Sequence, residues 1–137
     1  MQKVTHLIFA FLILILFGLI LNFPIYLSIF AFVGVLLPDL DTKPRMLHRK
    51  ICHNIWFLII ILFIGFNLNL LNKTSAIIIS IGFFSHIIGD ALTHQGISPL
   101  WPFKKPRFNG PIKTGGFGEY LIVLILLLMI YWVGTFI

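Results

Sequence analysis

The sequence carries little charge, because only 10% of its 137 residues are Asp, Glu, Lys or Arg. A soluble globular domain carries roughly 25% charged residues, so this chain cannot build a soluble surface. Hydrophobic residues make up 59% of the chain, and the mean hydropathy is +1.06. The composition therefore indicates an integral membrane protein. Because no stretch is polar or Gly/Ser-rich enough for a linker, residues 1–137 are expected to form one membrane-embedded domain.

Cysteine is almost absent, since Cys52 is the only one. A single cysteine excludes an intramolecular disulfide and a metal cluster held by several thiolates, and we expect Cys52 to pack in the interior.

The chain has four acidic residues against ten Lys and Arg, which gives a net charge of +6. No nucleic-acid-binding motif accompanies these basic residues, so nucleic acid is not an expected partner, whereas membrane topology accounts for them.

Five apolar segments alternate with polar loops, which predicts an all-α polytopic membrane bundle of about five helices. The segments are Val4–Leu21, Phe23–Leu37, Ile55–Leu71, Ala76–Gly89 and Tyr120–Ile137. A spanning helix needs about 20 residues, so the second and fourth segments are short and need flanking residues or tilt to cross a bilayer. The first segment has no small-residue cleavage site and is expected to be a retained anchor rather than a signal peptide.

Basic residues fall almost wholly on one side when these segments are threaded through a membrane. The N-terminus, the 38–54 loop and the 91–118 loop share a side with nine of the ten Lys and Arg, and the other side receives only Lys73. The positive-inside rule makes the first side cytoplasmic, with the N-terminus in and the C-terminus out of an inner membrane. All acidic residues and histidines fall on this side too, which predicts one polar site there: Asp39, Asp41, Asp90, Glu119, His6, His48, His53, His86 and His94.

The clearest pair of candidate ligands is His86 and Asp90, which lie four residues apart at the end of the fourth segment. In a helix this spacing puts both side chains on one face, where they can hold one ion. Neutral imidazole and carboxylate suit a divalent metal, zinc above all, with manganese or iron as alternatives. Taken alone, the pair is equally well interpreted as a structural His–Asp hydrogen bond at a helix end.

Further candidate ligands flank the other segments. Asp39 and Asp41 follow the second segment; helix capping explains one of them, and the presence of both favours a ligand cluster. His48 and His53 precede the third segment, and His6 lies one turn into the first. The basic residues around His48 suit contact with anionic lipid, and a lone histidine at a helix end is usually interfacial, but neither explanation requires three histidines on one side.

Five short motifs in order resemble the YdjM-type inner-membrane proteins, which are described as membrane-bound metal-dependent hydrolases. The motifs are THL (5–7), GVLLPDLD (34–41), HRKICH (48–53), HIIGDALT (86–93) and GISPLWPF (96–103). The resemblance covers nearly the whole chain, and it implies a polar set of His6, Asp39, Asp41, His48, His53, His86 and Asp90. His94 is not fixed by the motif and is expected behind the ligands or at the surface.

A more distant likeness suggests a reaction. Zinc-dependent phospholipase C and the S1/P1 nucleases carry an Asp, a His about fourteen residues later, and then HxxxD; Asp39, His53, His86 and Asp90 have similar spacing. This likeness implies a multinuclear zinc site that cleaves phosphoesters through metal-activated water. Asp39 or Asp41 would then bridge ions or act as general base.

The substrate and the biological role have more than one interpretation. Four basic residues near the site are expected to attract an anionic substrate such as a lipid or polyprenyl phosphate: Arg45, Arg49, Lys104 and Arg107. The alternative to an enzyme is a non-catalytic, metal-stabilised membrane adaptor that binds a cytosolic protein. A metal with an open coordination position favours the enzyme, whereas a site filled by protein ligands favours the adaptor.

Overall fold

The computed structural model describes residues 1–21, 25–40, 52–103 and 107–135. These residues form five α-helices: α1 (Lys3–Leu21), α2 (Ser28–Leu36), α4 (Ile55–Asn67), α5 (Lys73–Ala91) and α6 (Phe117–Gly134). Two short 3₁₀ helices, η1 (Ile25–Leu27) and η2 (Leu37–Leu40), flank α2. The described residues form no β-strand, only isolated bridges between Thr93 and Ile112 and between Ile97 and Phe108. The all-α prediction is therefore confirmed.

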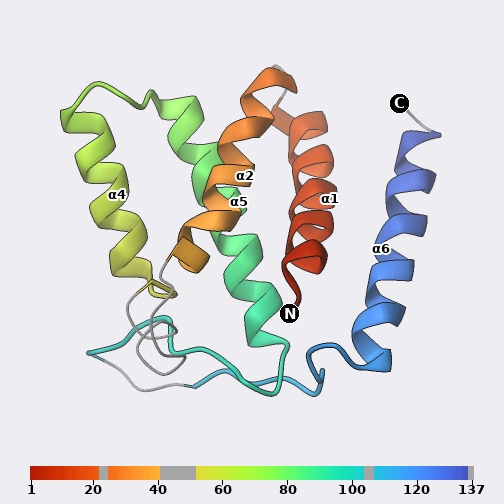
Figure 1. Cartoon of the computed structure of the whole chain (residues 1–137). Coiled ribbons are helices and arrows are strands. Elements are labelled where there is room, and N and C mark those ends of the chain that lie inside the picture. Colours follow the sequence, from red (N-terminus) through yellow and green to blue (C-terminus); the bar gives the residue numbers. More distant parts are fainter. Residues whose placement is uncertain (22–24, 41–51, 104–106, 136–137) are drawn as a thin grey trace.

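Helix α5 lies at the centre of the bundle, with α2 packed across it, α1 and α4 on its two sides, and α6 at the edge beyond α1 (Figure 1). The N-terminus, the end of α2 and the segment that joins α5 to α6 lie at one end of the bundle. The turn between α4 and α5 and the end of α6 lie at the other end. The chain thus runs up and down as the threading predicted, while the cytoplasmic assignment of the first end stays a prediction.

Three of the described helices, α1, α5 and α6, are long and apolar enough to cross a membrane, and Ser28–Leu40 and α4 are shorter. The fourth apolar segment gains length from residues at both of its ends. At its start Asn72 and Ser75 form a reciprocal capping box, which begins the helix at Lys73. The third segment is shorter than predicted: its helix ends at Asn67, before a turn in which Asn69 has a φ of 56°.

Two glycines allow α2 and α5 to pack with their backbones close together. A Cβ added at Gly34 would collide with the carbonyl oxygen of Ile79, and one added at Gly82 would collide with the carbonyl oxygen of Ala31. Small residues at a helix crossing are a common feature of membrane bundles, because they admit close van der Waals packing. This crossing lies one helical turn before His86 and therefore determines which way the end of α5 faces.

Helix α6 is peripheral, since only Glu119 and Leu126 of its residues are buried. Its apolar side chains are mostly exposed, as expected for a helix surrounded by lipid. The buried carboxylate of Glu119 accepts hydrogen bonds from the backbone N–H groups of Gln2 (2.6 Å) and Gly115 (2.7 Å). The start of α6 is in this way joined to the start of α1.

Candidate metal centre

Five predicted ligands from four parts of the chain meet at the end of the bundle that holds the N-terminus. They are His6 on α1, Asp39 on η2, His53 just before α4, and His86 and Asp90 on α5. His6, His53, His86 and Asp90 are each at most 2% exposed. The Asp39 side chain is 22% exposed, so the cluster is most accessible to solvent on the side of Asp39.

The residues around His53 determine that this histidine lies just before α4 and outside the helix. The Asn54 side chain accepts a hydrogen bond from the backbone N–H of Phe57 (2.8 Å), which caps α4 and leaves His53 outside the helix. The backbone N–H of Ile55 donates to the carbonyl of Pro99 (3.0 Å). The segment after α5 thus holds the start of α4, next to His53, in place. His53 can therefore turn toward α5 rather than follow the surface of α4.

The Nε2 atoms of the three histidines converge on the Asp90 carboxylate. His6 Nε2 lies 3.1 Å from Asp90 Oδ1, and His53 Nε2 lies 3.3 Å from Asp90 Oδ2. His86 Nε2 lies 3.7 Å from Asp90 Oδ2 and 3.9 Å from Asp39 Oδ1. The His6 and His86 rings stack with centroids 3.9 Å apart and an interplanar angle of 8°.

These distances fit a metal centre. Donor atoms about 2.1 Å from a tetrahedral zinc ion lie about 3.4 Å from one another, and the separations in the cluster bracket that value. Two overlapping groups, His6–His86–Asp90 and Asp39–His53–His86, each bring three ligand atoms within 4.8 Å of one another. Each group supplies three protein ligands, which leaves a fourth position for water or substrate.

The orientation of the imidazoles also favours a cation. His53 Nε2 and His86 Nε2 face each other at 3.3 Å in a buried space beside the carboxylate. The Nδ1 atoms of His6 and His86 are buried and have no hydrogen-bond partner among the described residues. A neutral imidazole carries its proton on one ring nitrogen only, so each of these rings can direct its Nε2 lone pair at a shared ion when the proton is on Nδ1.

Two residues outside the predicted ligand set, Gly89 and Glu119, hold His6 in place. A Cβ added at Gly89 would lie 2.7 Å from His6 Nδ1, so only glycine leaves room for the ring. Glu119 accepts a hydrogen bond from the backbone N–H of Gln2, one turn before His6. The sequence placed Glu119 at the polar end of the bundle but gave it no role, and it gave no signal for Gly89.

The N-terminal ammonium group of Met1 is a further partner of the cluster and donates to Asp90 Oδ1 at 2.8 Å. It shares this oxygen with His6. Asp90 is therefore surrounded by nitrogen atoms from the N-terminus and α1, from the residue before α4 and from its own helix.

The other predicted site residues do not join this cluster in the described part of the chain. Arg107 is exposed, and its guanidinium group donates to the carbonyl of Gln95 (2.9 Å). His94 is exposed, in keeping with its expected place outside the ligand set, and Cys52 is buried. Five predicted residues lie outside the described residues: Asp41, Arg45, His48, Arg49 and Lys104.

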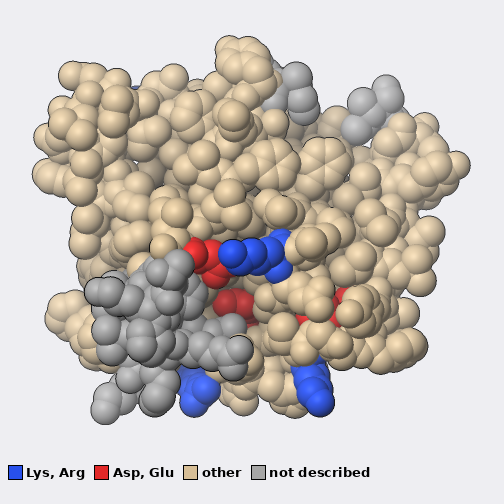
Figure 2. Space-filling model, in the orientation of Figure 1, with Lys and Arg blue, Asp and Glu red and all other residues tan. Residues whose placement is uncertain are grey.

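Charged side chains gather at the same end of the molecule. Figure 2 shows the face of the molecule that is seen in Figure 1. Carboxylates and basic residues surround a hollow in the lower half of that face, whereas the upper half is almost wholly uncharged. Charged side chains are costly at the centre of a bilayer, so this charged end is expected at a membrane surface.

Comparison with known proteins places the chain in a family. Neither the curated proteins nor the solved structures include a match for it. The family model described as YdjM inner membrane protein matches residues 1–136, which is almost the whole chain and includes every residue of the cluster. The chain therefore belongs to the YdjM inner membrane protein family.

Proposed function

We propose that the cluster of His6, Asp39, His53, His86 and Asp90 is the metal centre of a membrane-bound hydrolase that cleaves a phosphoester at the cytoplasmic face of the inner membrane. The observation that carries this proposal is the convergence of three imidazole Nε2 atoms and two carboxylates, from four segments, within ligand distance of one another. A single His–Asp hydrogen bond would not require the other three side chains.

The donor set favours zinc as the ion. Neutral imidazole nitrogen and carboxylate oxygen are typical zinc ligands, and no thiolate takes part in the described ligand groups. When bound, such an ion acts as a Lewis acid and lowers the pKa of water to about 7. His6, His86 and Asp90 would hold the ion as three protein ligands, and the burial of these side chains and of His53 excludes bulk water from one side of the centre.

Asp39 is our candidate for the general base. Its carboxylate lies at the wall of the cluster but stays 22% exposed, so it can take a proton at its carboxylate oxygen and pass it to solvent. The buried Asp90 carboxylate contacts three histidines, so its proposed role is to bind the ion and to orient the imidazole rings.

The phosphoester substrate is inferred from two supports. The first is the likeness of Asp39, His53, His86 and Asp90, in their spacing, to the zinc-dependent phospholipase C and S1/P1 nuclease pattern. The second is the position of the cluster at one end of an apolar bundle, where an amphiphile such as a lipid or polyprenyl phosphate would present its head group.

A metal-stabilised adaptor is the second candidate function. It is favoured by the near-complete burial of four of the five ligands, since closed and inaccessible sites are typical of structural metals. In this case the metal would hold the ends of α1, α4 and α5 together for a cytosolic partner, and no hydrolysis would occur.

The first experiment measures metal content of the purified full-length protein by elemental analysis. We expect a stoichiometric divalent metal in wild type, its loss in His86→Ala and Asp90→Ala, and its retention in the control His94→Ala, whose side chain is exposed. Wild-type protein without stoichiometric metal would rule out both candidate functions.

The second experiment separates the two functions with Asp39→Asn and the model phosphodiester bis(p-nitrophenyl) phosphate. If Asp39 is the general base, the variant keeps its metal and loses hydrolysis by about 10²-fold or more, the usual contribution of such a group. A metal-loaded wild type without phosphoester hydrolysis on this probe or on short-chain phospholipids would favour the adaptor.

A further inference from the structure

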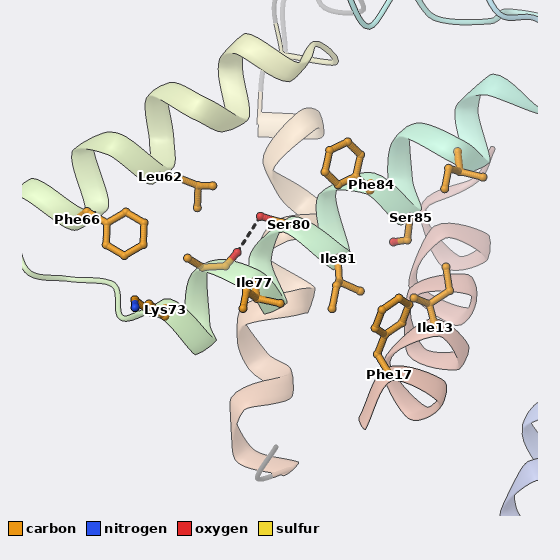
Figure 3. A pocket seen from close by; sticks show the side chains of 12 residues that line it. Ile13, Phe17, Leu62, Phe66, Lys73, Ile77, Ser80, Ile81, Phe84 and Ser85 are labelled. Carbon is orange, nitrogen blue, oxygen red and sulfur yellow. Dashed lines mark hydrogen bonds between the residues drawn. The ribbon is translucent and has the colours of Figure 1, made fainter. Parts of the chain in front are cut away.

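A second hollow lies on the other face of α5. It has a volume of about 580 Å³, which is within the range of roughly 300–1,000 Å³ that ligand pockets occupy. Figure 3 shows α5 as its floor, with Leu62 and Phe66 of α4 on one side and Ile13 and Phe17 of α1 on the other. Lys73 lies at one end of this groove and Ile88 lines its other end.

The groove is separate from the metal centre. Residues two apart on an α-helix point about 200° from each other. Phe84 and Ile88 line the groove, so His86 and Asp90, each two residues further on, face almost the opposite way. An occupant of the groove is therefore not the substrate of the centre, and the inference does not depend on the proposed function.

The walls of the groove suit a hydrocarbon chain. Apart from Lys73, its polar side chains are Ser80 and Ser85, and both hydroxyls donate to carbonyls of their own helix, those of Ala76 (2.8 Å) and Gly82 (2.7 Å). Neither serine therefore needs a hydrogen-bond partner from a ligand. The remaining lining side chains are apolar, so a polar small molecule would gain little from the site.

The groove is long enough for an acyl chain. From Lys73 to Ile88 the helix rises about 22 Å, which exceeds half of the roughly 30 Å hydrocarbon core of a bilayer. A chain that enters beside Lys73 would remain in contact with protein past the middle of the membrane.

Lys73 provides the charge that would select a head group. It is exposed and lies at the bundle end opposite the metal centre, and no ion pair involves it among the described residues. It also occupies the first turn of α5, which contains no acidic residue. A cation there opposes the helix dipole, whereas an anion bound beside it interacts favourably with both the ammonium group and the helix N-terminus.

We propose that this groove binds an anionic phospholipid from the leaflet opposite the metal centre. One acyl chain would lie between α1, α4 and α5, and the lipid phosphate would contact the Lys73 ammonium group. The lipid would fill the space between α4 and α1 and support the packing of both helices on α5.

The test is native mass spectrometry of the full-length protein titrated with phosphatidylglycerol or phosphatidylcholine in detergent. We expect wild type to bind phosphatidylglycerol more tightly. Lys73→Gln should reduce that preference by about fivefold, the factor for one cation near a charged surface, and leave phosphatidylcholine binding intact. The control Lys113→Gln, which removes an exposed lysine at the other end, should behave as wild type.

A second variant tests the chain-binding part of the groove. Ser80→Phe places a ring in the groove and should weaken binding of both lipids, with circular dichroism and gel filtration used to check that the protein is folded. Wild-type lipid preference in Lys73→Gln, an equal loss in Lys113→Gln, or unchanged binding of both lipids in a folded Ser80→Phe would each overturn the proposal.

Discussion

Asp90 Oδ1 lies 3.1 Å from His6 Nε2, although 84 residues separate the two in the chain. The second carboxylate oxygen of Asp90 faces His53 and His86 instead. A single buried carboxylate thus joins α1, α5 and the junction before α4. Its loss would leave three imidazoles without their common anion.

Metal removal should therefore loosen the whole end of the bundle. If an ion joins these segments, a chelator that strips it should lower the melting temperature of wild type, because binding to the folded state alone stabilises that state. Asp90→Asn should start at a lower melting temperature and change little with chelator. Differential scanning fluorimetry with and without EDTA measures both, and an identical chelator response in the two proteins would contradict a metal held by Asp90.

Gly89→Ala should displace His6. The added methyl group would meet His6 Nδ1 at 2.7 Å, and overpacking of this kind typically destabilises by about 1–3 kcal/mol. We expect a lower melting temperature and a lower metal content. Gly118→Ala is the matched control, because it also lies in a helix but has no atom within 4 Å of an added Cβ. Equal effects of the two substitutions would show that the contact with His6 is unimportant.

Glu119→Gln should weaken metal binding from a distance. The carboxylate accepts from two backbone N–H groups, and a glutamine side chain has one oxygen with which to replace it. The first turn of α1, which carries His6, would lose part of its anchor. We expect metal affinity to fall by up to about tenfold, the lower range for residues that support ligands.

Competition with a chromogenic zinc chelator measures this affinity. Tyr120→Phe is the control, since Tyr120 is the exposed neighbour of Glu119. Wild-type affinity in Glu119→Gln, together with a lowered melting temperature, would mean that Glu119 supports the fold without positioning His6.

The membrane orientation predicts opposite labelling of two exposed positions. On a Cys52→Ala background, Lys113→Cys should react with a membrane-impermeant maleimide only after cells are lysed, because its end of the bundle is expected to face the cytoplasm. Thr135→Cys, at the other end, should react in intact spheroplasts. The reverse pattern would place the metal centre on the outer face and refute the predicted topology.

Local patterns were enough to predict the number and type of the helices. Hydropathy depends on neighbouring residues, so five apolar segments and a charged end could be predicted before any packing was known. His86 and Asp90 could be paired in the same way, since a spacing of four residues is a property of one helix. The end of α4 was less predictable because Leu68–Leu71 is apolar apart from Asn69, while the turn itself depends on backbone conformation.

The sequence by itself predicted a polytopic helical membrane protein with its histidines and carboxylates at one end. Only the tertiary structure decided that His6 and His53 reach Asp90, because contacts across tens of residues depend on how helices pack rather than on spacing. The close approach of α2 and α5 at Gly34 and Gly82 turns His86 toward the other ligands. The roles of Gly89 and Glu119 and the groove on the far face of α5 follow from the same packing, for which no local pattern exists.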